Sequence, residues 1–148
     1  GVTRARQIAD KLDTPIAIID KRRNNKYQPE VRNIVGDVDG KDCIIIDDRI
    51  DTAGSAIAAA KALKSHGAKR IRMAVTHPVF SDPAYDRLTK EKVFEKIYVT
   101  DSIPLKDKFK QTKDIRIQVV SLDTRLADVI ESISHNKSIS EVYYRFAD

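Results

Sequence analysis

Three carboxylates lie within five positions of one another, where an apolar segment meets a helical pattern. The residues of this stretch that can do chemistry are Asp47, Asp48, Asp51, Thr52, Gly54 and Ser55. Hydroxyl groups and the free backbone N–H groups at the start of a helix bind anions. Carboxylates accept hydrogen bonds from the vicinal hydroxyls of a sugar and can organise hydrated Mg²⁺. Residues 47–55 therefore predict a binding site for a sugar phosphate.

A simpler interpretation of the same stretch is an acidic helix start, with Asp51 or Thr52 as the N-cap residue. We favour the binding site, because three acids, two hydroxyls and a glycine are more than a cap requires. The stretch lacks the pattern of a P-loop, G-x-x-x-x-G-K-[ST].

The surrounding elements alternate between strand and helix patterns. Helices are expected over residues 3–12, 53–66 and 123–135, and strands over residues 16–20, 43–47, 70–78, 96–101 and 115–121. Apolar strands separated by helices indicate an α/β fold with a mainly parallel sheet covered by helices on both faces. Ligands bind beyond the carboxyl ends of such strands, which is where Asp47 and Asp48 are expected.

The composition is that of a globular domain. The chain has 148 residues, of which 41% are hydrophobic and 33% charged, so a single domain over residues 1–148 can bury a core. No apolar run is long enough to span a bilayer, and no signal peptide is visible. The single cysteine, Cys43, is expected to be a buried small hydrophobe in a reducing, cytoplasmic compartment. The net charge of +5 suits an anionic partner, either a nucleic acid or a phosphorylated ligand.

A second charged stretch covers residues 21–32, with five basic residues and one acid. It is either a solvated basic loop, a nucleic-acid patch with Tyr27 as its aromatic residue, or a set of cations that closes over phosphates. The three histidines are weaker signals, since none has a partner at metal-ligand spacing. His66 is expected to have a structural role at a helix end, His135 to lie at the surface, and His77 to have a packing or interface role.

Several segments resemble one family. "IIIDDRIDTAGS" resembles the ribose-phosphate-binding motif of type I phosphoribosyltransferases and of ribose-phosphate pyrophosphokinases, also called phosphoribosyl pyrophosphate synthetases. The segments that resemble the second group, in order, are "GVTRARQIADKL", "IAIIDKRR", "NIVGDVDGKDCIIIDD", "THPVFS" and "SIS". The resemblance covers nearly all of the chain. It implies a type I phosphoribosyltransferase-like fold and Mg²⁺-dependent transfer of a diphosphoryl group from ATP to ribose 5-phosphate.

The resemblance also assigns roles to residues. It implies that Lys21 and Arg23 are catalytic cations on a closing loop, and that Ser138 and Ser140 contribute to an allosteric site for phosphate or ADP. The residues implied to bind ribose 5-phosphate are Arg23, Asp47, Asp48, Asp51, Thr52, Ala53, Gly54 and Ser55. No metal ligand is implied within this chain. The segment Asn24–Tyr27 departs from the family's usual Pro-Arg-Pro-Asn, and Arg49 stands where an apolar residue is usual.

Members of this family are about twice as long and have two similar domains, and the chain resembles the C-terminal one. It begins at Gly1 without a Met, and the family's magnesium ligands and main ATP contacts lie outside it. We therefore expect an isolated domain that binds ribose 5-phosphate but does not catalyse alone. Its expected partners are its own N-terminal domain and further copies in a homo-oligomer, with no nucleic acid and no membrane. A phosphoribosyltransferase and a non-catalytic synthetase-associated subunit remain the alternatives.

Overall fold

The computed structural model describes residues 2–22 and 30–144. Its elements, in chain order, are α1 (Val2–Lys11), β1 (Ile18–Arg22), β2 (Glu30–Val35), β3 (Asp42–Ile50), α2 (Gly54–Ser65), β4 (Arg70–Pro78), α3 (Ala84–Glu91), β5 (Lys96–Thr100), α4 (Asp107–Gln111), β6 (Ile117–Val120), α5 (Asp123–Ser134) and α6 (Ser140–Tyr144).

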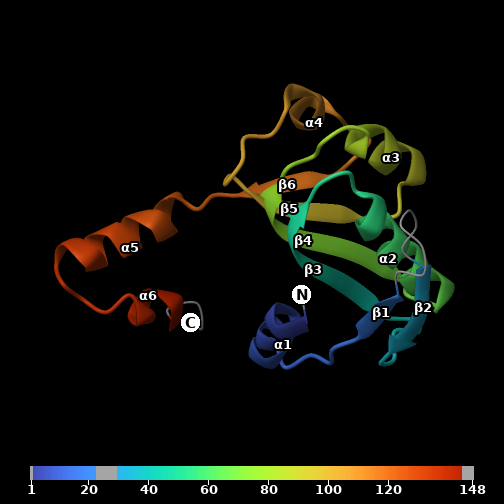
Figure 1. Cartoon of the computed structure of the whole chain (residues 1–148), viewed down its shortest axis with the longest axis horizontal. Coiled ribbons are helices and arrows are strands. Elements are labelled where there is room, and N and C mark those ends of the chain that lie inside the picture. The colour runs from blue at the N-terminus through green and yellow to red at the C-terminus, as the bar shows by residue number, and fades with distance from the viewer. Residues whose placement is uncertain (1, 23–29, 145–148) are drawn as a thin grey trace.

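Four parallel strands form the main sheet, in the order β3-β4-β5-β6 (Figure 1). The register places Met73 beside Ile45 on one side and Ile97 on the other, and Ile97 beside Ile117. Helices flank this sheet, so the predicted α/β fold is confirmed. All four carboxyl ends lie at one edge, as the sequence argument requires.

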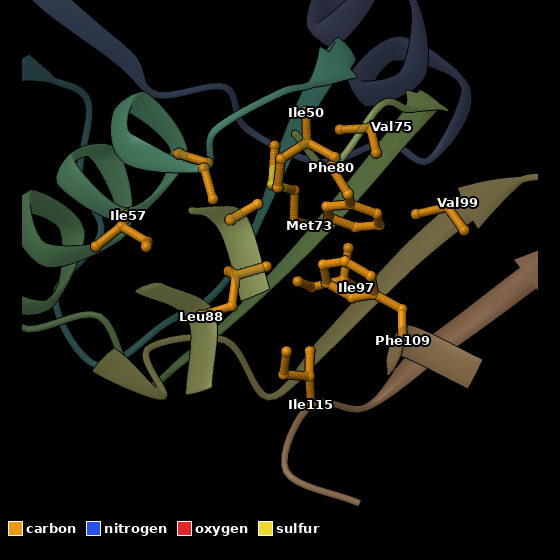
Figure 2. Packing of buried hydrophobic residues seen from close by; sticks show 13 residues of the cluster. Ile50, Ile57, Met73, Val75, Phe80, Leu88, Ile97, Val99, Phe109 and Ile115 are labelled. Carbon is orange, nitrogen blue, oxygen red and sulfur yellow. The ribbon is translucent and has the colours of Figure 1, made fainter. Parts of the chain in front are cut away.

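The core lies between the sheet and its connecting helices (Figure 2). Met73 and Ile97 of the central strands are 1% and 0% exposed, and they share one cluster with Leu88 of α3. Phe80, which follows β4, stacks on Phe109 of α4 with ring centroids 4.2 Å apart. The hydrophobic contacts therefore fix α2, α3 and α4 against the same face of the sheet.

Helices cover the two faces of the sheet unequally in the part of the chain that the structure describes, since only α1 contacts β3 on the side of Ile44. The strand order advances in one direction, so right-handed crossovers place the connecting helices on one face. Ile44 and Val120 remain 50% and 49% exposed. Helix α5 extends away from the sheet (Figure 1) and has no buried residue.

The first predicted strand is not part of the parallel sheet. Strand β1 pairs antiparallel with β2 in a separate two-stranded sheet, and β2 lies where the sequence predicts only a polar stretch. Ile19 pairs with Ile34 in this hairpin, and both pack against a cluster that contains Leu63 of α2. The hairpin thus buries its apolar side chains against α2 instead of joining the main sheet.

Candidate functional site

We call residues 47–55 the acidic loop, although its first residues belong to a strand. Strand β3 continues through Ile50, beyond the predicted end at Asp47, because its pairing with β4 persists as far as Ile50 and Pro78. The backbone N–H of Phe80 then donates to the carbonyl oxygen of Ile50 at 3.1 Å. Asp47 and Asp48 therefore lie within the last residues of β3, held by strand pairing.

The two adjacent carboxylates of the acidic loop are fixed by backbone N–H groups. The N–H of Asp48 donates to Oδ1 of Asp47 at 2.9 Å, and the N–H of Arg49 donates to Oδ1 of Asp48 at 3.0 Å. The pKa of Asp48 is held below its usual value, chiefly by a hydrogen bond with the Asp47 side chain and further by Arg4. Nη1 of Arg4 lies 3.9 Å from Oδ2 of Asp48. Asp48 is consequently ionised at neutral pH and accepts hydrogen bonds.

Helix α2 begins without a side-chain cap. Its N-cap residue is Ala53, which has a left-handed backbone (φ 61°) and has no side-chain oxygen to accept a capping hydrogen bond. The alternative interpretation of Asp51 or Thr52 as the N-cap is therefore wrong. Ala53 is 3% exposed and its carbonyl accepts the N–H of Ile57 at 2.9 Å. The first-turn N–H groups of α2 are thus free of a side-chain cap, which is the condition for binding an anion there.

Gly54 lies against a residue that sequence analysis missed. Nη1 of Arg87, on α3, donates to the carbonyl oxygen of Thr52 at 3.1 Å. A Cβ atom on Gly54 would lie 3.1 Å from the same Nη1. The missed signal is the helical spacing of Ala84 and Leu88 directly after Pro83, which favours a helix start.

The other carboxyl ends of the sheet are joined by side-chain hydrogen bonds. The hydroxyl of Ser102 donates to the carbonyl of Thr76 at 2.9 Å, so Nδ1 of His77, 2.9 Å from the same hydroxyl oxygen, is the donor to it. This contact is of the packing kind predicted for His77. Asp101 accepts the hydroxyl of Ser121 at 2.5 Å and the N–H of Leu122 at 2.9 Å, and these bonds lower its pKa.

The remaining histidines lie near helix ends, as the sequence predicts, whereas the cysteine is less buried than expected. Nδ1 of His66 lies 2.8 Å from the carbonyl of Ala62 at the end of α2, and His135 forms the corresponding contact at the end of α5. Cys43 is half-buried instead of buried, because its side of β3 lines a cleft, and this partial burial raises the pKa of its thiol.

No group of three or more His, Cys, Asp or Glu side chains is arranged to hold a metal ion within residues 2–22 and 30–144. Asp47, Asp48 and Asp51 therefore form no dedicated cage in this part of the chain. Mg²⁺ is commonly held by one or two carboxylates together with substrate phosphates and water. The acidic loop fits that second mode of binding better than a metal centre of its own.

A cleft of about 720 Å³ lies beside the acidic loop and not within it. Its lining comes mainly from α1, the segment between α1 and β1, and β3, and it includes Ile8, Ile19 and Ile44. Of the acidic loop only Asp47 lines this cleft. The start of α2 instead faces outward at the edge of the sheet, with Asp51 and Ser55 exposed.

The other predicted site residues lie elsewhere. The backbone of Lys21 belongs to β1 and pairs with Val31, whereas Arg23 lies outside the described residues. Ser138 and Ser140 are exposed, and the N–H of Ser140, at the start of α6, donates to Oγ of Ser138 at 3.2 Å. Their allosteric role stays a prediction.

Among the helices of the described residues, none combines the length and the apolar character that a membrane span requires.

Comparison with known proteins gives consistent matches over nearly the whole chain. Residues 3–145 match the family described as phosphoribosyl synthetase-associated domain. The ribose-phosphate pyrophosphokinase of Fusobacterium nucleatum subsp. nucleatum is 48% identical over 143 residues, which is 97% of this chain and 44% of that protein. Ribose-phosphate pyrophosphokinase 2 of Enterococcus faecalis is 48% identical over 143 residues, or 97% of this chain and 43% of that protein.

A solved structure agrees with these sequence matches. The crystal structure of phosphoribosylpyrophosphate synthetase from Mycobacterium smegmatis superposes with a TM-score of 0.77 at 36% identity, covering 91% of this chain and 42% of that one. The chain thus spans less than half the length of the relatives that it matches. These matches do not support the expectation that the chain corresponds to the C-terminal half of the enzyme. They show a match to less than half of the enzyme's length.

Proposed function

Because the chain belongs to the phosphoribosyl synthetase-associated domain family, we propose that it supplies the ribose 5-phosphate site of a ribose-phosphate pyrophosphokinase. The observation that carries the proposal is the acidic loop. It combines an ionised carboxylate, Asp48, with a helix start that has no side-chain cap. A single ligand can bind both the carboxylate and the helix start only if it has hydroxyls at one end and a phosphate at the other.

The proposed binding mode follows from the donors and acceptors of the acidic loop. The phosphate of ribose 5-phosphate accepts hydrogen bonds from the first-turn N–H groups of α2 and from the hydroxyls of Thr52 and Ser55. The carboxylates of Asp47, Asp48 and Asp51 accept hydrogen bonds from the ribose hydroxyls. This fixes the sugar, so that its anomeric hydroxyl is held for attack on the β-phosphorus of ATP, with AMP as the leaving group.

Charge stabilisation of the transferring group is proposed for Lys21 and Arg23, because the resemblance of residues 16–23 to the family implies this role for them. Phosphoryl transfer depends mainly on positioning and on stabilisation of negative charge, and cations on a loop that closes supply both. Mg²⁺ is proposed to reach the reaction with the phosphates of ATP. No step is assigned to it through this chain, because the described residues form no metal cage.

A non-catalytic role is the second candidate, and the family's own description as synthetase-associated favours considering it. In that role the chain would bind the sugar phosphate and act by assembling with a synthetase. It differs from the first candidate in what Lys21 and Arg23 do, since assembly does not require cations at a reacting phosphate.

A turnover assay distinguishes the two candidates. The 148-residue chain is incubated with ATP, Mg²⁺ and ribose 5-phosphate, alone and with the part of a related pyrophosphokinase that this chain does not match. We expect no product from the chain alone and AMP release from the combination. A combination that assembles and binds ribose 5-phosphate but releases no AMP would favour the non-catalytic role. Steady turnover by the chain alone would overturn the expectation that it is incomplete.

A further inference from the structure

We infer that Arg87 is a positioning residue that holds the acidic loop in the shape that binds the sugar phosphate. The inference rests on the proposed function for the identity of the ligand, and on the contacts of Arg87 for the shape of the loop. Arg87 lies on α3, more than thirty residues after the acidic loop, and was not among the residues predicted to contribute to the site.

The guanidinium of Arg87 approaches the turn that starts α2 at two points. Its Nη1 donates to the carbonyl oxygen of Thr52 at 3.1 Å. The same nitrogen lies 3.1 Å from the position of a Cβ atom on Gly54. Between these two residues Ala53 has its left-handed backbone, which costs free energy in any residue other than glycine. Arg87 thus binds the residue before the strained Ala53 and lies close to the residue after it.

The helix that carries Arg87 is itself firmly placed. Ala84 and Leu88 of α3 are 0% and 3% exposed in the main core. Nζ of Lys61 on α2 lies 2.7 Å from Oε2 of Glu91 on α3, which joins the two helices a second time. The core therefore holds α3 in place, and the side chain of Arg87 connects this fixed helix to the acidic loop, in which Asp51 and Ser55 are exposed.

The charge of Arg87 suits an anion at the same place. Among the described residues, Arg87 forms no ion pair and its only side-chain hydrogen bond is to Thr52. A guanidinium remains ionised at all ordinary pH values and has five N–H donors, of which this contact uses one. The start of α2 and Arg87 consequently contribute positive potential to one spot, where the phosphate is proposed to bind.

The first test compares Arg87→Ala and Arg87→Lys with Lys90→Ala, which removes an exposed charge from the same helix. Isothermal titration with ribose 5-phosphate should show about tenfold weaker binding for Arg87→Ala, since a hydrogen bond from a charged group is lost. Arg87→Lys, which keeps one donor and the charge, should recover part of the affinity, and Lys90→Ala should match the unaltered chain. Unchanged affinity in Arg87→Ala would overturn the inference, as would equal losses in Arg87→Ala and Lys90→Ala.

A second measurement needs no ligand. The N–H of Ile57 donates to the carbonyl of Ala53, so its hydrogen exchange reports on the first turn of α2. Exchange at Ile57 should be severalfold faster in Arg87→Ala and unchanged in Lys90→Ala. If the unaltered chain fails to bind ribose 5-phosphate, the proposed function fails, and exchange at Ile57 still decides the role of Arg87. Equal exchange in Arg87→Ala and the unaltered chain would overturn that role.

A double substitution tests the contact at Gly54 directly. Gly54→Ala adds a Cβ atom 3.1 Å from Nη1 of Arg87, so the guanidinium must shift and the change should affect the urea midpoint of unfolding less favourably than it does without Arg87. In the Arg87→Ala background the same change meets no guanidinium, and alanine has the higher helix propensity. Gly54→Ala should then be neutral or stabilising. Equal effects of Gly54→Ala in both backgrounds would contradict the proposed contact.

Discussion

The carbonyl oxygen of Ile50 accepts a hydrogen bond from the backbone N–H of Phe80 at 3.1 Å. Ile50 lies in the acidic loop at the end of β3, and Phe80 follows the end of β4. Both side chains are almost fully buried, at 2% and 1% exposure. The shape of the candidate site therefore depends on the core directly beneath it.

Phe80→Ala should lower both stability and binding. Loss of the ring removes its stacking on Phe109 and leaves a cavity, which costs about 3–5 kcal/mol of the free energy of unfolding. Urea denaturation checks this, with Ile44→Ala as the control, because Ile44 is 50% exposed and should cost less than about 1 kcal/mol. A cost for Phe80→Ala no larger than that for Ile44→Ala would contradict the packing described here.

Asp51→Ala should weaken ribose 5-phosphate binding by roughly tenfold, because an exposed carboxylate that accepts a sugar hydroxyl is lost. Stability should change little, since this side chain is exposed at the start of a turn. Isothermal titration measures the affinity, and Asp10→Ala on α1 is the matched control. If both variants bind as tightly as the unaltered chain, Asp51 does not contact the ligand.

Lys21→Ala and Arg23→Ala concern the catalytic step of the complete enzyme. Each should lower kcat by about 10³-fold while ribose 5-phosphate affinity changes far less, because the charges act on the transferring group. Steady-state kinetics of an enzyme that contains this chain measures both quantities. Near-normal kcat in both variants would leave residues 21–32 as a solvated basic loop.

Acid should destabilise the fold partly through Asp101, which accepts hydrogen bonds from Ser121 and Leu122. Its pKa in the folded chain lies below its usual value of 3.8. Its contribution to stability is therefore present above that value and is lost as the pH falls through the lower, folded-state pKa. Asp101→Asn should lower the urea midpoint at pH 7, and the difference from the unaltered chain should shrink below about pH 4. A difference that stays constant down to pH 2 would exclude ionisation of Asp101 as the cause.

The sequence predicts the main sheet and the acidic loop well because their signals are local. Strand β3 contains four consecutive apolar residues and β4 contains three, and the apolar residues of α2 recur at helical spacing over 12 residues. The position of Asp47 at the carboxyl edge follows from this order of elements alone. The helix expected over residues 123–135 also forms, as α5.

Sequence analysis missed the features that depend on contacts between distant segments. Strand β2 is stable because Ile34 packs on α2, which no pattern within residues 30–35 reveals. The role of Arg87 depends on a bond to Thr52 from a short helix of 8 residues with only two buried side chains. Ala53 as the N-cap was also unexpected, since its left-handed backbone is set by the surrounding packing.

The central claim is that ribose 5-phosphate binds at the acidic loop, and a residue-resolved NMR titration tests it most directly. Amide resonances of the chain are followed as ribose 5-phosphate is added. The account predicts saturable shifts centred on residues 47–55, which need about tenfold more ligand to saturate in Asp51→Ala and the usual concentration in Asp10→Ala. Shifts centred instead on the cleft beside α1, or no saturable shift at all, would contradict it.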